Sequence, residues 1–414
     1  MGSLRQYFAQ FGPGLLYAGA AVGVSHLVQS TRAGAEFGFQ LLAVVIIVNV
    51  LKYPVFETGA RYAAATGKSL LDGYLRIGKW AVVVYVIMSV LTMFIIMSAI
   101  SIVTAGLSTQ LLEISVQPRV LAVVLLVLAT IILGLGHYSV LDRTMKFIII
   151  LLAISTLAAL ILAALDTVEK DPNFMTVFDW GDSADILFLV ALIGWMPAPI
   201  DISVWHSVWS VSKFKERGSR ASMPIALRDF KVGYWGTTLL ACCFLSLGAL
   251  VMYATGITLA DSGVGFSDQL VSMYTSSIGQ WAFPLIAVAA FTTMFSTLLT
   301  CFDAFPRTLR LSSKLLIQGL NNRKSHIKIY WFWLITTGVG TSVILLFFLS
   351  DMWQMVDLAT TISFVVAPIL ATLNFIAIND KAEVAPEHRQ PKWLKVFNLI
   401  SIALLYSFSI WFLI

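Results

Sequence analysis

Residues 12–38 read GPGLLYAGAAVGVSHLVQSTRAGAEFG, and the fold depends on this stretch. Its apolar run is interrupted at Gly23-Val24-Ser25-His26, where a hydroxyl and an imidazole follow a glycine. A helix needs about 20 apolar residues to cross a hydrocarbon core of roughly 30 Å, so this polar group falls near mid-depth. Polar groups at that depth occur where they are buried in protein or line a cavity. The stretch is therefore either a small-residue packing face or a discontinuous helix whose freed backbone groups bind a solute.

The composition is that of a polytopic membrane protein. Of the 414 residues, 58% are hydrophobic and only 12% are charged, with a mean hydropathy of +0.87, whereas soluble domains carry about 25% charged residues. The basic residues are spread over loops, which excludes a nucleic-acid-binding protein despite the net charge of +5. The three cysteines lie in apolar segments and fit neither a disulfide framework nor a zinc motif. We expect no cleavable signal peptide, because the first apolar segment lacks a small-residue cleavage pattern.

Eleven apolar segments are long enough to be membrane spans. They lie at residues 13–31, 40–60, 80–107, 118–136, 145–166, 185–210, 232–255, 280–302, 329–350, 353–378 and 394–414. With a cytoplasmic N-terminus, 23 of the 27 basic residues fall in cytoplasmic segments; the exceptions are Arg32, Lys52, Arg119 and Lys170. The positive-inside rule thus predicts a cytoplasmic N-terminus and an external C-terminus. We expect the protein to reside in the plasma membrane, which is the inner membrane in bacteria.

A second interruption lies in the sixth segment, which reads GWMPAPID over residues 194–201. Two prolines one residue apart remove two amide donors and clash with the preceding turn. Taken alone, they are also explained by a simple kink. Asp201 favours a functional site, because a carboxylate inside a span is costly and is usually retained for a function. The alternative is that Asp201 is a structural partner for a serine, a backbone amide or His206.

The two interruptions lie five spans apart, in spans one and six. Interrupted helices at matching places in two halves are typical of inverted-repeat transporters that bind their solute at the membrane midplane. We therefore predict an all-α protein with two five-helix repeats, residues 1–166 and 185–378, and an additional span at residues 394–414. Because five is odd, the second repeat starts on the opposite side of the membrane, as inversion requires.

Sequence motifs for ATP hydrolysis or catalysis are not visible. No phosphate-cradling glycine loop ends in Lys-Ser or Lys-Thr, which argues against primary ATP-driven transport by this chain. A membrane-embedded enzyme would need a nucleophile–base set or a zincin-type helix motif, and neither is apparent. We expect a transporter rather than an enzyme, with the lipid bilayer and a small solute as its partners.

At the two interruptions the sequence resembles the Nramp family of proton-coupled divalent-metal transporters, which belongs to the amino acid–polyamine–organocation superfamily. The matching residues are Gly12-Pro13-Gly14, Ala33–Gly38, Ala65-Thr66-Gly67-Lys68 and Met196-Pro197. The resemblance extends over spans one to ten. It implies a LeuT-type fold, in which a 5+5 inverted repeat has its first and sixth helices interrupted.

The departures from the family pattern fall on the family's metal site. Its Asp-Pro-Gly-Asn motif is replaced by Gly23-Val24-Ser25-His26, so the metal-binding carboxylate is missing. The family histidine after Met-Pro is Ala198, and the family glutamine of helix ten falls at about Thr360. The acids that the family uses for proton movement have no counterpart in span three. On this resemblance, the family's metal site carries over only at Met196.

We predict a binding site for an ion or small solute at the following residues between the two interruptions: Gly23, Ser25, His26, Met196, Ala198, Asp201 and Thr360. His26, Met196 and Asp201 supply nitrogen, sulfur and oxygen, a set compatible with a borderline divalent metal ion. The ion would be the substrate, and no cofactor is expected. Either His26 or Asp201 would be the proton-linked group, since the titration range of histidine suits proton coupling.

The missing carboxylate leaves a second function open. A secondary transporter of a small organic or amino-acid-like solute could use the same interruptions as a polar cradle, because a half-helix N-terminus attracts a carboxylate. Trp195 and Trp205 would then wall the ligand. A metal carrier should gather side-chain O, N or S atoms around one point, whereas an organic-solute carrier should have a larger pocket.

Overall fold

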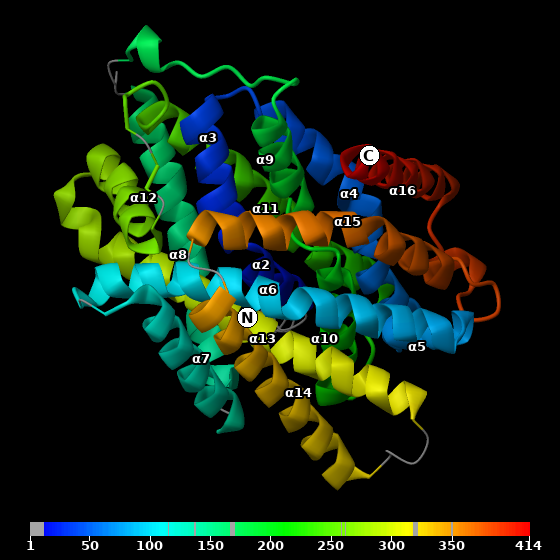
Figure 1. The fold of residues 1–414 in the computed structure, drawn as a ribbon. Helices are drawn as coiled ribbons and strands as arrows, with labels where there is room; N and C mark the ends of the chain where they lie inside the picture. The colour runs from blue at the N-terminus through cyan, green and yellow to red at the C-terminus, as the bar shows by residue number, and fades with distance from the viewer. Residues whose placement is uncertain are drawn as a thin grey trace, which may run out of the picture.

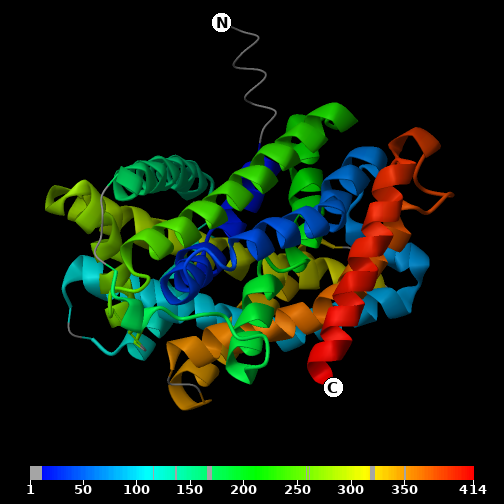
Figure 2. The same ribbon diagram turned by 90° about the horizontal axis from the view of Figure 1, so that it is seen from above.

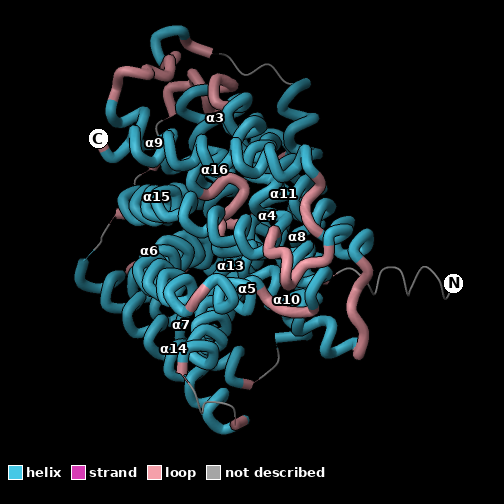
Figure 3. Tube along the Cα trace, turned by 90° about the vertical axis from the view of Figure 1, so that its right-hand side faces the viewer, coloured by secondary structure: helices cyan, strands magenta, loops and turns pink. Residues whose placement is uncertain are grey.

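The computed structural model describes residues 12–114, 116–135, 138–165, 170–257, 259–260, 262–317, 322–348 and 351–414. Within these ranges, the side chains of residues 138–149 and of Arg323 are not described. Within these ranges every regular element is a helix (Figures 1 and 3). The first eleven residues of the predicted first repeat, and residue 166 at its end, lie outside the described residues.

The helices follow one another without intervening strands in the described ranges. The first half contains α2 (Pro13–Ala21), the π-helix η1 (Val24–Ser30), α3 (Thr31–Phe37), α4 (Leu42–Thr66), α5 (Leu70–Ile77), α6 (Lys79–Leu112), α7 (Pro118–Gly134) and α8 (Tyr138–Leu165). The second contains η2 (Pro172–Phe174), α9 (Ser183–Gly194), α10 (Asp201–Arg217), α11 (Met223–Val251), α12 (Gly263–Ile278), η3 (Gln280–Ala282), α13 (Phe283–Leu316), α14 (Arg323–Val343), η4 (Ile344–Phe348), α15 (Met352–Ile378), η5 (Pro386–His388) and α16 (Lys392–Leu413).

Each of the eleven predicted spans coincides with a helix or an interrupted helix pair. Among the described residues, seven helices are long and apolar enough to cross a membrane, and α7, residues 150–165 of α8, and α9 are shorter apolar helices. The structure adds α5 and α12, which the hydropathy pattern did not predict. Both are short helices set by local signals: a capping box at Ser69 and Asp72 begins α5, and the Ser262 hydroxyl accepts from the Gly265 amide at the start of α12.

The first predicted interruption is confirmed at Val22 and Gly23. The α-helical pattern ends at Ala21, and the chain then continues as the π-helix η1. Gly23 has φ −153° and ψ −130°, outside the helical region. A Cβ at Gly23 would lie 2.8 Å from the Thr297 methyl carbon of α13. The glycine thus permits the break and also lets α13 approach it closely.

The second predicted interruption is confirmed between α9 and α10. Residues 195–200 are non-helical, and the Met196-Pro197 peptide bond is cis. Gly194, at the end of α9, packs against α15 so closely that a Cβ there would lie 2.2 Å from the Thr360 carbonyl oxygen. The C-terminal end of α9 is consequently packed directly against α15.

The interrupted helices occupy the middle of the bundle. In Figure 1, α2 lies centrally, while α6 and α15 cross in front of it. α13 packs along α6, α11 packs against α2, η1 and α3, and α15 packs against α9. Seen from above, α16 lies at the outer edge next to α4 (Figure 2). α14 and α16 expose most of their apolar side chains, as helices in contact with lipid do.

Candidate ion site between the two helix breaks

A small cavity lies where the two breaks meet. Its volume is about 20 Å³, and it is lined by Ala20, Ala21, Val24, Ser25, Ile96, Ile100, Trp195, Pro199, Ile202, Trp205, Thr297 and Cys301. This is space for about one water molecule or one small ion. The sequence pattern predicts Ser25 at this place but not Thr297 or Cys301, because nothing in span eight indicates which of its faces turns toward the breaks.

His26 is buried and both of its ring nitrogens have partners. Nε2 donates to the Thr237 carbonyl oxygen of α11 at 3.0 Å, and Nδ1 lies 2.7 Å from the Ser25 hydroxyl oxygen. The Ser25 hydroxyl is also 2.8 Å from the Ala21 carbonyl oxygen. In this conformation His26 therefore ties the first break to α11, and it is not among the residues that line the cavity.

Met196, Ala198 and Thr360 are buried around the second break. The Met196 sulfur lies 3.9 Å from the Ser30 hydroxyl, which joins the two interrupted helices. Ala198 is 1% exposed and offers no side-chain ligand. The Thr360 hydroxyl donates within its own helix to the Val356 carbonyl at 2.8 Å. The contact between the second break and α15 is instead made by Trp195, whose indole Nε1 donates to the Ser363 hydroxyl at 2.8 Å.

Asp201 begins α10 directly after the second break and is 2% exposed. A carboxylate at a helix N-terminus is favoured by the helix dipole. Its Oδ1 atom is buried without a hydrogen-bond partner in the described residues. The helix that Asp201 begins, α10, packs against α2, α4, α5 and α13.

Lys52 occupies the other end of the second break. Its ammonium donates to the Ile193 carbonyl at 2.5 Å and to the Gly194 carbonyl at 3.1 Å, although the side chain comes from α4 and is 1% exposed. A cation at a helix C-terminus satisfies carbonyls that have no partner within the helix. Each half-helix end at this break therefore meets a charge of opposite sign: Lys52 at the end of α9 and Asp201 at the start of α10. The only sequence signal for Lys52 was a lysine inside a span.

Other buried acids near the core already have partners. Glu57 pairs with Arg61 at 2.6 Å, and Asp303 pairs with Arg307 at 2.6 Å. The Asp229 carboxylate accepts from the backbone amides of Gly12 and Gly14 at the start of α2. Asp201 differs from these acids because one of its oxygens has no hydrogen bond.

The predicted metal ligands are not brought together as one cluster in this conformation. Among the described residues, no three His, Cys, Asp or Glu side chains converge. His26 contacts Ser25 and Thr237, whereas Met196 contacts Ser30. The ligand set of His26, Met196 and Asp201 remains a prediction.

An ion-pair network lies at one end of the interrupted helices. The Arg32 guanidinium of α3 lies 3.1 Å from an Asp357 carboxylate oxygen of α15 and 2.9 Å from Glu36. It also lies 4.6 Å from the ring centroids of both Phe188 and Trp353. The network therefore joins α3, α9 and α15 in this conformation.

Two interrupted helices that meet around an enclosed cavity, inside a bundle of apolar helices, define a membrane transporter architecture. A family model described as "Natural resistance-associated macrophage protein-like" (Nramp) matches residues 14–414, and the chain belongs to this family. The resemblance inferred from the sequence is thereby confirmed. The chain is 36% identical over 409 residues to the uncharacterized protein PM0681 of Pasteurella multocida (strain Pm70), covering 98% of this chain and 92% of the relative.

Solved structures share the fold. A mutant of the Eremococcus coleocola manganese transporter matches with a TM-score of 0.73 at 15% identity, covering 98% of this chain and 86% of the other. MhsT in complex with L-phenylalanine matches with a TM-score of 0.61 at 12% identity, covering 96% and 98%. The predicted LeuT-type fold with interrupted helices one and six is confirmed. The chain is an integral membrane protein of a transporter family.

Proposed function

We propose that this protein is a secondary transporter that carries a divalent metal ion through the space between the two helix breaks. Family membership and the shared fold with a manganese transporter support this substrate class. The observation that carries the proposal is Asp201, a buried carboxylate directly after a break with one oxygen lacking a hydrogen bond. Such a group stabilises a cation and disfavours an anion.

The size of the cavity also favours an ion over an organic solute. About 20 Å³ is available between the breaks, whereas pockets for small organic ligands are typically about 300–1,000 Å³. A wider pocket of about 290 Å³ is lined mostly by apolar residues of α4, α9, α15 and α16, together with Trp180, Lys52 and Ser401. Alternating access would open the small cavity to each side of the membrane in turn.

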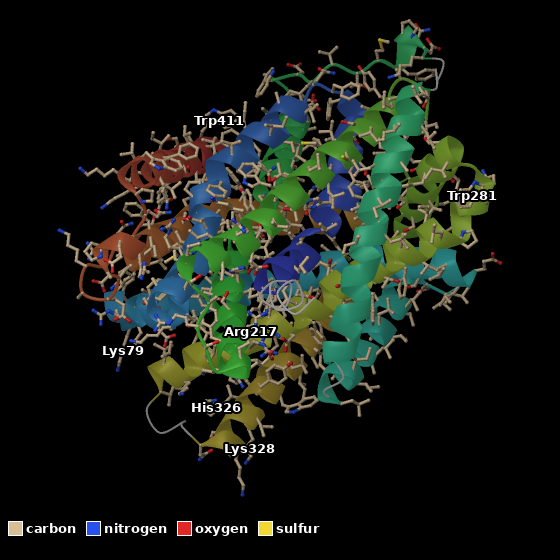
Figure 4. The ribbon with its side chains drawn as sticks, turned by 180° about the vertical axis from the view of Figure 1, so that it is seen from behind. Lys79, Arg217, Trp281, His326, Lys328 and Trp411 are labelled. Carbon is tan, nitrogen blue, oxygen red and sulfur yellow. The ribbon has the colours of Figure 1, made fainter. Side chains whose placement is uncertain are left out.

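The same proposal includes the orientation of the chain, the membrane in which it resides and the coupling ion. The N-terminus is cytoplasmic and the C-terminus is external. The protein resides in the plasma membrane. Figure 4 supports this orientation, because Lys79, Arg217, His326 and Lys328 lie in its lower half, which contains the helix ends expected in the cytoplasm. Transport is coupled to protons through His26 or Asp201.

Metal uptake by proteoliposomes tests the function. Purified protein is reconstituted in liposomes that contain a dye responsive to Mn²⁺ or Mg²⁺, and influx is compared with that of empty liposomes. We expect saturable influx of at least one of the two ions, together with acidification reported by a pH-sensitive dye. Asp201→Asn should lower influx at least about tenfold, since it removes the charge that offsets the desolvated cation.

The matched control is Glu113→Gln, which removes one charge from an exposed residue at the end of α6. Its influx should equal that of the unmodified protein. Absence of influx for both ions, together with uptake of a radiolabelled amino acid, would contradict the metal-ion function and support the organic-solute alternative.

A further inference from the structure

The end of the molecule where α13 finishes and α14 begins is strongly basic. The sequence contains no Asp or Glu between Asp303 and Asp351. The basic residues of this stretch are Arg307, Arg310, Lys314, Arg323, Lys324 and Lys328. Residues 317–322 join α13 to α14, so these residues belong to one end of a pair of membrane-spanning helices. In Figure 4, His326 and Lys328 mark this end at the bottom of the molecule.

Several basic residues of the other predicted cytoplasmic segments pair with acids of the protein itself. The nitrogen–oxygen distances are 2.9 Å for Lys68–Glu383, 3.0 Å for Arg76–Asp380 and 2.8 Å for Lys213–Glu216. At the α13–α14 end, one oxygen of Asp303 pairs with Arg307 and the other accepts from the Tyr330 hydroxyl at 2.7 Å. Both oxygens of this carboxylate thus have partners. No ion pair within the described part of the chain neutralises the following four residues: Arg310, Lys314, Lys324 and Lys328.

Arg310 is the member of this group that is partly buried. Its Nε atom is buried and has no hydrogen-bond partner among the described residues. A buried donor without an acceptor is costly, so an acceptor that the chain does not supply is expected here. Lys314 is exposed and lies one turn further along the same face of α13. A guanidinium holds a phosphate group through two parallel hydrogen bonds, and a neighbouring ammonium adds a second positive charge.

The same end also presents apolar and aromatic side chains to the bilayer. The exposed apolar residues are Ile317, Ile327 and Phe332. Trp331 and Trp333 follow in α14, and the Trp333 indole Nε1 donates to the Ser313 hydroxyl of α13 at 3.2 Å. Tryptophan is enriched where a membrane-spanning helix reaches the lipid headgroups. Charge and apolar surface therefore lie side by side at headgroup depth, which matches a phospholipid better than a free anion.

We propose that Arg310, Lys314, Lys324 and Lys328 bind the phosphate headgroup of an anionic phospholipid, whose acyl chains lie along the exposed apolar side chains of this helix pair. Basic pockets between membrane-spanning helices bind anionic headgroups in this way. The positive-inside rule alone requires only charge at this end and leaves the unpaired Nε of Arg310 unexplained. The inference does not depend on which ion or solute the protein carries.

Phospholipid binding to the purified full-length protein tests the site. Native mass spectrometry during titration with phosphatidylglycerol, which is anionic, or phosphatidylcholine, which has no net charge, gives the affinity for each lipid. Arg310→Gln combined with Lys314→Gln should weaken phosphatidylglycerol binding about 10- to 30-fold, since each basic residue near an anionic surface contributes about fivefold. Phosphatidylcholine binding should not change. The matched control, Lys381→Gln combined with Lys392→Gln, removes two exposed charges from another predicted cytoplasmic segment and should leave the affinity for both lipids unchanged.

Size-exclusion profiles and thermal unfolding establish that each variant is folded, and Lys324→Gln combined with Lys328→Gln, both at exposed positions, replaces the first pair if it is not. Unchanged phosphatidylglycerol affinity in the folded variants overturns the site. An equal loss in the control pair also overturns it, because binding would then follow total charge rather than this end of the molecule. Glycerol 3-phosphate, the soluble headgroup, should bind far more weakly than phosphatidylglycerol, and equal affinity for the two would show a site for a free phosphate instead of a lipid.

Discussion

The ion-pair network at Arg32 predicts how firmly this conformation is closed. Asp357 accepts from Arg32 Nη1 at 3.1 and 3.3 Å and from Gln29 Nε2 at 3.1 Å. The side chains of Arg32 and Asp357 are only 17% and 20% exposed. Hydrogen bonds to charged groups contribute about 1.5–3 kcal/mol each, and many exposed pairs contribute less than 1 kcal/mol.

Asp357→Asn keeps an acceptor for Gln29 but removes the charge opposite Arg32. For this partly buried pair we expect a loss of about 2–3 kcal/mol from the closed state, which corresponds to a shift of roughly 30- to 150-fold toward open conformations. The aromatic contacts of Arg32 with Phe188 and Trp353 remain. They keep the arginine in place, so the shift measures the carboxylate alone.

Cys301 is a natural reporter of opening, because it lines the central cavity and is 3% exposed. In a background with Cys242→Ser and Cys243→Ser, a polar thiol reagent should modify Cys301 roughly 30- to 150-fold faster in Asp357→Asn, provided that opening is in rapid equilibrium. The control Asp268→Asn removes an exposed carboxylate that accepts from Gln110. Equal modification rates in Asp357→Asn and in the parent protein would refute the role of this network as a closure.

Three further substitutions test the local structure, each by thermal unfolding in detergent. Lys52→Met removes the ammonium that bonds the last two carbonyls of α9; because the Ile193 carbonyl keeps the Met196 amide as a donor, the loss of stability should come mainly from the Gly194 carbonyl and amount to about 1–3 kcal/mol, whereas Lys52→Arg should retain part of the stability. Gly23→Ala places a Cβ 2.8 Å from the Thr297 methyl carbon, so it should lower stability unless Thr297 is also replaced by Ala. Asp380→Asn removes a carboxylate whose pKa is held below its ordinary value, first by a backbone amide and then by Arg76; its destabilisation should be present at neutral pH and vanish as the pH falls through that lowered pKa.

Much of the fold could be predicted from local patterns. Hydropathy alone located the eleven spans, and the glycine and proline clusters located both breaks, because these residues act on the backbone where they stand. The family resemblance followed from short motifs in the same stretches. The helices α5 and α12 escaped prediction because they are short and contain polar residues, which a search for apolar segments passes over.

The partners of the polar side chains could not be predicted in the same way. The sequence by itself determined a membrane-embedded helical transporter with two interrupted helices, since bilayer thickness and backbone hydrogen bonding act on each segment separately. The pairing of His26 with Thr237 and the capping of α9 by Lys52 come from the tertiary structure. These contacts join residues 141 to 211 positions apart, and they depend on how each helix is rotated against its neighbours, which packing between helices sets and local composition does not.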